Sequence, residues 1–226
     1  MFQFVLLIML LLTIPITIGI ELIAAKRGIA HSPAFGLLVI SLLLAPFRLA
    51  VTVQVSSYSV DIPLVFGGIV ILILIERRQI QDFYITRQGL LYAMLDGIAL
   101  SIISFLLLNL LSNYLPVRYN LQSPNIISVQ SISTALQIGI IEELLFRSLL
   151  LGYLRRLRFT PTNANLIQAM WFAVSHIRYL QNGDFGMMFV VISLGLLCGY
   201  MTLRRKNVTG AMILHIAVNM LFSYSN

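Results

Sequence analysis

Charged residues are scarce in this sequence, and there is only one cysteine. Asp, Glu, Lys and Arg make up 10% of the 226 residues, whereas 59% are hydrophobic, and the mean hydropathy is +0.93. Because a soluble domain carries about 25% charged residues, the composition predicts a polytopic membrane protein. Cys198 lies in an apolar run. It allows no intrachain disulfide, and the CxxC spacing of redox and metal sites is absent.

Several sequence patterns of catalysis and targeting are also missing. The HExxH motif of helical zinc proteases and the GxSxG motif of serine hydrolases do not occur, so neither kind of site is predicted. The first residues contain no basic segment, and no small-residue cleavage site stands out. We therefore interpret the first apolar segment as a retained span and not as a signal peptide.

Long apolar segments dominate the chain. A membrane helix needs about 20 mostly apolar residues, and eight segments approach that length: residues 2–24, 34–54, 60–76, 89–111, 126–152, 163–180, 185–203 and 207–224. The predicted fold class is all-α, a polytopic integral membrane protein with about eight transmembrane helices. Thr160-Pro161 resembles a helix start before the sixth segment, and Asn182-Gly183 a tight turn before the seventh.

Basic residues alternate between the connections. The net charge is +7, but the basic residues form short clusters between apolar runs, as topology signals do, so nucleic-acid binding is not expected. The intervening connections hold only Arg118 and Arg178. The positive-inside rule places four connections in the cytoplasm and both termini outside. Those four contain Lys26, Arg27, Arg77, Arg78, Arg87, Arg155, Arg156, Arg158, Arg204, Arg205 and Lys206.

The fifth segment contains three ionisable residues within six positions, in the pattern Glu142-Glu143-x-x-x-Arg147. Each costs at least a few kcal/mol at membrane depth, so a functional role is expected. His176 and His215 lie in later apolar segments. From the predicted topology, Glu142, His176 and His215 lie roughly 18, 20 and 12 Å from the cytoplasmic face of a core about 30 Å thick. Similar depth on three helices favours a single site.

Helical spacing suggests roles for these residues. Glu143 and Arg147 can face each other as an i,i+4 ion pair, whereas Glu142 is turned about 100° away. Asn219 lies one turn after His215 and could stabilise an oxyanion. A glutamate beside a histidine could deprotonate a water. Alternatively, Glu142, His176 and His215 form the ligand set of a hydrolytic zinc site.

Blander interpretations remain open for the same residues. The Glu143–Arg147 pair can be purely structural, and membrane histidines often serve helix packing. Asp96 in the fourth segment could pair with Arg48 in the second. Asn207 begins a glycosylation pattern, but it lies at the predicted cytoplasmic boundary, where that pattern has no meaning.

The three pieces Glu142-Glu143-x-x-x-Arg147, Phe172-x-x-x-His176 and His215-x-x-x-Asn219 resemble the motifs of the CPBP family of intramembrane proteases. These are also called Abi or type II CAAX prenyl endopeptidase-like proteins. The resemblance implies that Glu142 and His176 activate the hydrolytic water, and that His215 and Asn219 hold the oxyanion. It further implies that Glu143 and Arg147 support the site, with Phe172 packed beside it. One divalent metal such as zinc, or none, is compatible with the resemblance.

The resemblance covers about residues 126–224. We interpret residues 126–226 as a catalytic transmembrane core and residues 1–125 as about four helices without a recognised motif, together one structural unit. The implied activity is hydrolysis of a peptide bond in a membrane-associated protein or peptide, either prenylated or unprenylated. The implied location is a bacterial plasma membrane or an organellar membrane, in contact with lipids. A non-catalytic partner or bacteriocin self-immunity protein with this fold, and a small transporter, are the alternatives.

Overall fold

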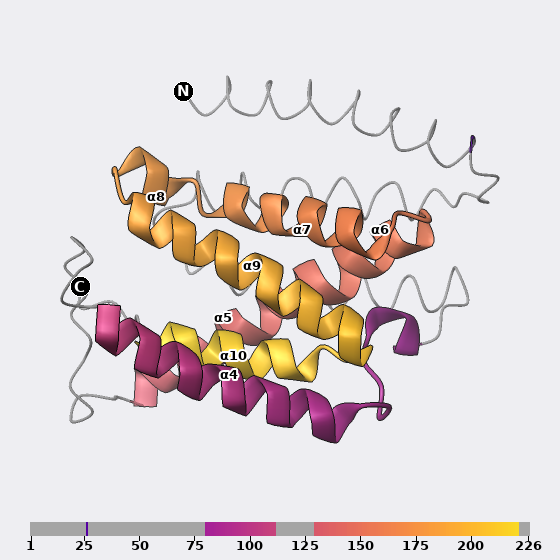
Figure 1. Cartoon of the computed structure of the whole chain (residues 1–226), viewed down its shortest axis with the longest axis horizontal. Coiled ribbons are helices and arrows are strands. Elements are labelled where there is room, and N and C mark those ends of the chain that lie inside the picture. Colours follow the sequence, from indigo (N-terminus) through magenta and orange to yellow (C-terminus); the bar gives the residue numbers. More distant parts are fainter. Residues whose placement is uncertain (1–25, 27–79, 112–128, 222–226) are drawn as a thin grey trace.

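The structure, a computed structural model, describes residue 26 and residues 80–111 and 129–221. In these ranges the chain is helical and contains no strand, which confirms the predicted all-α class. The elements in chain order are the 3-10 helix η1 (Ile80–Phe83), α4 (Leu90–Leu111), α5 (Val129–Glu143), the π-helical segment η3 (Leu144–Leu150), α6 (Leu151–Arg156), α7 (Pro161–Ser175), α8 (Arg178–Gln181), α9 (Phe185–Arg205) and α10 (Thr209–Leu221) (Figure 1).

Two described helices are long and apolar enough to cross a membrane. These are α4, over Leu90–Leu107, and α9, while α10 is apolar but shorter. The fifth predicted span corresponds to α5, η3 and α6, which follow one another directly from residue 129 to residue 156. The predicted spans 2–24, 34–54 and 60–76 lie outside the described residues, so the number of eight spans stays a prediction.

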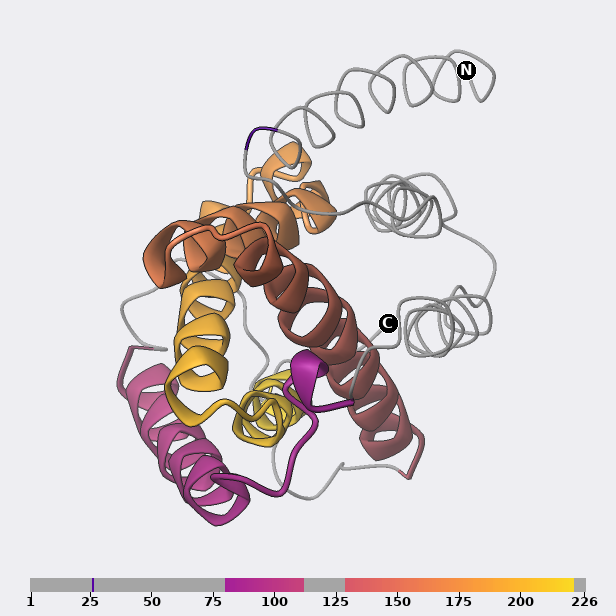
Figure 2. The ribbon, with the colours of Figure 1, turned by 90° about the vertical axis from the view of Figure 1, so that its right-hand side faces the viewer.

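Helix α10 lies at the centre of the described bundle. It packs against α4, α5 and α9, and Figure 2 shows it nearly end-on between them. The contact with α4 is close because two glycines meet there: a Cβ on Gly97 would lie 2.6 Å from the Gly210 carbonyl oxygen. Small residues let membrane helices approach in this way. The buried His215 is thereby held inside the bundle, on the helix that packs against α5.

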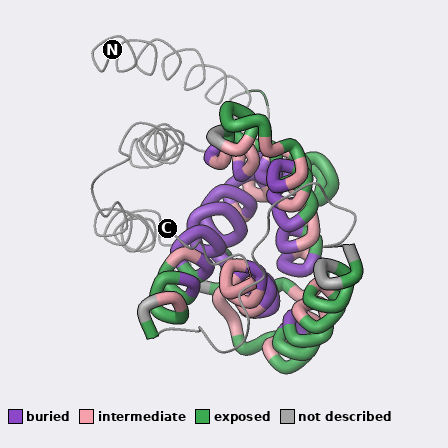
Figure 3. Tube along the Cα trace, turned by 90° about the vertical axis from the view of Figure 1, so that its left-hand side faces the viewer, coloured by how far each residue is buried: buried purple, intermediate pink, exposed green. Residues whose placement is uncertain are grey.

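Burial is uneven among the helices. Residues 141–151 of the α5–η3–α6 segment are all buried, whereas α4 exposes apolar side chains such as Leu91, Leu106 and Leu110 along its length (Figure 3). A helix that is apolar all round and largely uncovered fits a hydrocarbon surrounding. The polar residues of interest therefore lie in the covered half of the bundle, away from the outer face of α4.

The basic connections of the described region gather at one end of the bundle, the right-hand end in Figure 1. This end contains the α6–α7 connection, the α9–α10 connection and the segment before α4. Asn207 is buried here, with Nδ2 donating to the Thr86 carbonyl at 2.5 Å and Oδ1 accepting from the Thr209 amide at 2.9 Å. These contacts give Asn207 a structural role.

Asp96 is paired with Arg205 across the α4–α9 contact. Its carboxylate accepts from Nε of Arg205 at 2.6 Å and from a terminal guanidinium nitrogen at 3.0 Å. The expected partner, Arg48, lies outside the described residues. Because Arg205 ends α9 and Asp96 lies near the start of α4, this pair fastens two helices at the basic end.

Helix α7 begins as predicted and ends earlier than predicted. Thr160 caps it, since its hydroxyl accepts from the Asn163 amide at 3.2 Å and Pro161 follows. The prediction of one helix over 163–180 is wrong at its end, because α7 stops at Ser175 and α8 is a separate turn. At His176 the backbone leaves helical geometry (φ −108°, ψ 18°). The helix end was not predicted because apolar residues continue in the sequence beyond His176.

Candidate active site

Glu142 and Glu143 are the last residues of α5, immediately before η3 (Leu144–Leu150). Every residue of η3 is buried, including Arg147. Short π-helical segments within α-helices are rare and occur frequently at functional sites, because the wider turn changes the direction of side chains that follow. Here the segment follows the glutamate pair directly and contains Arg147, the arginine of the first motif.

Glu143 holds Arg147 and His215 on one carboxylate oxygen. Its Oε1 lies 2.7 Å from a terminal guanidinium nitrogen of Arg147, and both side chains are 0% exposed. The same oxygen lies 2.7 Å from Nδ1 of His215. The predicted Glu143–Arg147 ion pair is thus confirmed, and the bond to His215 is an addition. Because a carboxylate oxygen accepts, Nδ1 of His215 carries the proton and the lone pair of the neutral ring lies on Nε2.

His176 is oriented by the end of α7. Its Nδ1 lies 2.9 Å from the Phe172 carbonyl oxygen, one turn earlier, and 2.9 Å from the Ser175 hydroxyl. The last carbonyls of a helix have no intrahelical partner, so a ring N–H can satisfy one of them. A carbonyl oxygen only accepts. Nδ1 is therefore the protonated nitrogen, and Nε2 of the neutral ring is an acceptor.

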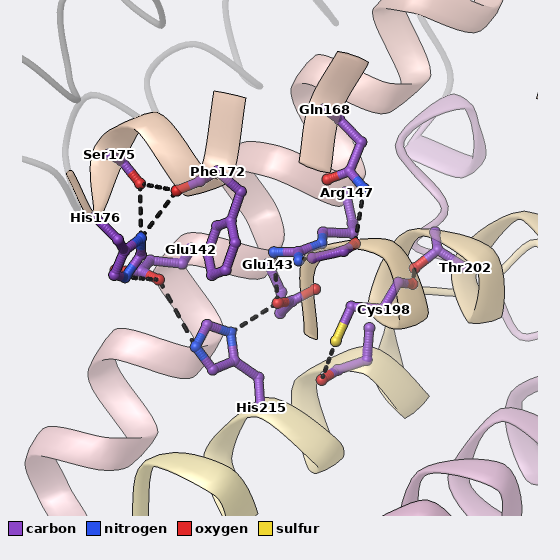
Figure 4. Close-up of polar contacts among 12 residues, drawn as sticks. Glu142, Glu143, Arg147, Gln168, Phe172, Ser175, His176, Cys198, Thr202 and His215 are labelled. Atoms are coloured by element: carbon purple, nitrogen blue, oxygen red, sulfur yellow. Dashed lines mark hydrogen bonds and ion pairs between the residues drawn. The ribbon is translucent and has the colours of Figure 1, made fainter. Parts of the chain in front are cut away.

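The two imidazoles meet at Glu142. Its Oε2 lies 3.9 Å from Nε2 of His176 and 3.7 Å from Nε2 of His215 (Figure 4). This oxygen is buried and has no hydrogen-bond partner among the described residues. Three acceptors thus surround one point, and they need a donor between them. A water there can donate to two of them while keeping a lone pair for attack on a carbonyl carbon.

A metal ion is a less close fit to the same atoms as they are placed. Ligand atoms of a tetrahedral zinc ion lie roughly 3.3 Å from one another, since each is about 2.0–2.1 Å from the metal. The distances from Glu142 Oε2 to His215 and His176 are 3.7 and 3.9 Å. No group of three or more His, Cys, Asp or Glu in the described ranges is arranged to hold a metal ion. The predicted ligand set would have to close by about half an ångström.

Phe172 packs against both histidines of the site and against Arg147. Its ring centroid lies 4.6 Å from that of His176 and 5.7 Å from that of His215. The guanidinium carbon of Arg147 lies 4.4 Å from the same centroid, within cation–π range. Phe172 thus packs against the two histidines and Arg147, in the packing role that the sequence predicted.

Asn219 lies on α10, one turn after His215. Its side-chain nitrogen is buried and has no hydrogen-bond partner within the described part of the chain. An unpaired buried N–H costs about 1–3 kcal/mol, and such groups in native proteins call for an explanation such as a functional role. A donor kept unpaired in this way suits an oxygen that becomes negative only during a reaction.

Exposure falls across the site in one direction. The side chains of His176, Glu142 and His215 are 20%, 11% and 3% exposed. Tyr179 stacks on the ring of His176 at a centroid distance of 6.1 Å. The site is therefore open on the His176 side, where α7 ends, and closed on the side of α10.

Sequence reasoning missed three contributors to this site: Ser175, Gln168 and the carbonyl of Gly195. Gln168 Nε2 donates to the Gly195 carbonyl oxygen at 2.8 Å, beside Arg147. One signal was present, because Gln168, Phe172 and His176 repeat at i, i+4 and i+8 and so share a helix face. A backbone carbonyl, by contrast, leaves no trace in a sequence.

The family model described as type II CAAX prenyl endopeptidase Rce1-like matches residues 124–221. The match contains all three motif pieces and confirms the resemblance drawn from them. It also bounds the similarity to the C-terminal part of the chain. No curated protein and no solved structure matches the chain.

Proposed function

We propose that this protein is an intramembrane endopeptidase that hydrolyses a peptide bond with a water activated by Glu142 and His176. The observation that carries the proposal is the convergence of Glu142 Oε2 with Nε2 of both His176 and His215, at 3.9 and 3.7 Å. The Rce1-like match supports a CAAX-protease-type activity. A buried carboxylate oxygen without a donor is costly unless the site uses it.

The chemistry follows from the positions of donors and acceptors. Glu142 takes a proton from the water while the water oxygen forms a bond to the peptide carbonyl carbon. The carbonyl oxygen becomes an oxyanion, to which the unpaired Asn219 N–H donates. Nδ1–H of His215 stays on Glu143, and this bond holds the ring with its Nε2 beside Glu142. Glu142 then passes the proton to the leaving nitrogen as the C–N bond breaks, which gives a carboxylic acid and an amine.

The proposed substrate is a membrane-associated protein or peptide. We place the protein in a bacterial plasma membrane or an organellar membrane, as a multi-pass protein with both termini non-cytoplasmic. Two membrane-length apolar helices support a location in a membrane, and the basic connections at one end of the bundle support an orientation with that end in the cytoplasm. A prenyl group on the substrate, and a divalent metal in the site, are separate questions that the experiment below resolves.

The test is peptide release by the full-length protein in liposomes, against a panel of matched prenylated and unprenylated peptides. Glu142→Gln keeps the shape of the side chain but removes the base, so cleavage should fall by about 10²-fold or more. Asp184→Asn is the matched control, because asparagine also caps α9 at this position. Loss in both variants, or in neither, would contradict the assignment of the base.

A second arm adds a strong chelator to the wild-type protein. Unchanged cleavage supports the water mechanism as described, whereas loss that is restored by zinc assigns Glu142, His176 and His215 as metal ligands. If the wild type cleaves no peptide and Glu142→Gln still performs the protein's cellular role, the enzymatic proposal is wrong. A non-catalytic partner with this fold would then be the better description.

A further inference from the structure

Gln168 is a buried polar side chain beside the site to which none of the three motifs assigns a role. It is 0% exposed and lies one helical turn before Phe172 on α7. Its Nε2 donates to the Gly195 carbonyl oxygen at 2.8 Å and to Oδ1 of Asn165 at 2.7 Å. The bond to Gly195 joins α7 to α9, and the bond to Asn165 joins Gln168 to the preceding turn of α7.

The Gly195 carbonyl is shared between Gln168 and Arg147. A terminal guanidinium nitrogen of Arg147 donates to it at 3.4 Å, and Figure 4 shows the ends of the Arg147 and Gln168 side chains close together. The other terminal nitrogen of Arg147 binds Glu143. A continuous path of polar contacts thus runs from Gln168 through Gly195 and Arg147 to Glu143.

The orientation of the Gln168 amide is determined by its partners. Asn165 donates from Nδ2 to the Leu196 carbonyl at 3.0 Å, so its Oδ1 faces Gln168. A flipped Gln168 amide would point its oxygen at two other oxygens, that of Asn165 and that of Gly195. Gln168 Oε1 instead remains buried without a partner among the described residues. The protein accepts this cost, which suggests that the position of the NH₂ group matters.

The backbone of α9 is shaped to admit these amides. A Cβ at Gly199 would clash with Asn165 Oδ1 and Gln168 Nε2. A Cβ at Gly195 would lie 3.3 Å from Cδ1 of Phe172. Gly195 and Gly199 form a GxxxG pair, which lets helices pack closely. Here the close approach lets the side-chain amides of Gln168 and Asn165 donate to backbone carbonyls of α9.

We propose that Gln168 is a positioning residue for the Arg147–Glu143–His215 array. By holding the Gly195 carbonyl, it fixes the second anchor of the Arg147 guanidinium, whose first anchor is Glu143. Arg147 in turn fixes the Glu143 oxygen that holds the proton on Nδ1 of His215. This inference rests on the proposed peptidase function, but its first consequence, the state of His215, can be observed without turnover.

The decisive variant is Gln168→Met, which keeps the length of the side chain and removes its donors. In the liposome assay kcat should fall about 10- to 100-fold, because a small misplacement of catalytic groups has effects of this size. KM should stay within about twofold, because Gln168 touches no substrate. Asn165→Ala, at a half-buried position, should act in the same direction with a smaller loss, and it provides a second variant if Gln168→Met does not fold.

The control is Thr202→Val. Thr202 lies on α9 and is buried, as Gln168 is on α7. Its hydroxyl donates to the Cys198 carbonyl at 2.9 Å, within the same helix. The substitution removes one buried side-chain hydrogen bond of the same kind without touching Arg147 or Gly195. It should leave kcat and KM unchanged, so a loss equal to that of Gln168→Met would mean that packing alone explains both.

Nitrogen-15 histidine spectra supply the readout that a purely structural role would not change. The chain has three histidines, and His31→Gln together with His176→Gln assigns the signals. In Gln168→Met the Nδ1–H signal of His215 should shift or broaden, while Thr202→Val should leave it in place. An unchanged His215 signal overturns the proposal, and so does an unchanged kcat in an active protein. A shifted signal in a protein that cleaves nothing supports the positioning role and contradicts the peptidase.

Discussion

Two arginine–carboxylate pairs occur in this molecule in very different surroundings. Arg147 and Glu143 are both 0% exposed and lie against the candidate site, whereas Arg205 and Asp96 are 24% and 26% exposed at the basic end. The outer pair has the better hydrogen-bond geometry, with two bonds at 2.6 and 3.0 Å. The buried pair uses the same Glu143 oxygen for His215. The comparison shows that the buried pair orients the His215 ring, whereas the more exposed pair with better hydrogen-bond geometry joins two helices.

The largest effect in this comparison should come from Arg147→Met. It removes the cation and leaves the Glu143 carboxylate buried with only His215, a situation that costs about 3–5 kcal/mol in buried pairs. Thermal unfolding in detergent should show a large fall in Tm, and peptide release should be abolished. A variant of wild-type stability would mean that the pair contributes nothing to the fold.

A smaller effect on stability is expected when the buried pair is neutralised on both sides, in Glu143→Gln with Arg147→Met. Replacing both charges removes the penalty of the uncompensated carboxylate, so a good part of the lost Tm should return. Activity should not return, since both the carboxylate at His215 Nδ1 and the cation that fixes its position are removed. The check is a double-mutant cycle in which Tm and kcat are measured on the same samples. Recovery of both would show that the pair is only structural.

The smallest effect should come from Asp96→Asn in the outer pair. Partly exposed ion pairs contribute little, because water solvates both partners when the contact is lost. Tm should change by no more than a few degrees, and kcat and KM should equal those of the wild type. A strong loss of activity from this variant would indicate that the contact between α4 and α9 affects the geometry of the site.

Much of the candidate site could be predicted from local spacing, because its motifs lie within single helices. The i,i+4 relation gave the Glu143–Arg147 pair, and Thr160-Pro161 gave the start of α7. Similar membrane depth also anticipated that Glu142, His176 and His215 would meet. These inferences use only helix geometry and the length of the spans, which a sequence expresses directly.

The parts that sequence reasoning missed depend on contacts between distant residues or on the backbone. The bond between His215 and Glu143 joins residues 72 positions apart, and no periodicity encodes it. The end of α7 was missed because Ile177 and Leu180 continue the apolar pattern across the break. The link from Gln168 to Arg147 passes through the carbonyl of Gly195, and every residue type has such a carbonyl.

The early end of α7 constrains how this protein can vary during evolution. Because the ring of His176 satisfies the Phe172 carbonyl, the residue proposed for chemistry also terminates the helix. An insertion or deletion between Gln168 and His176 would rotate the histidine off its face of α7 and move the helix end with it. Length changes should therefore accumulate beyond α8, around the Gly183 turn, where a Cβ would meet nothing within 4 Å. The position of His176 and the length of α7 are therefore inherited together.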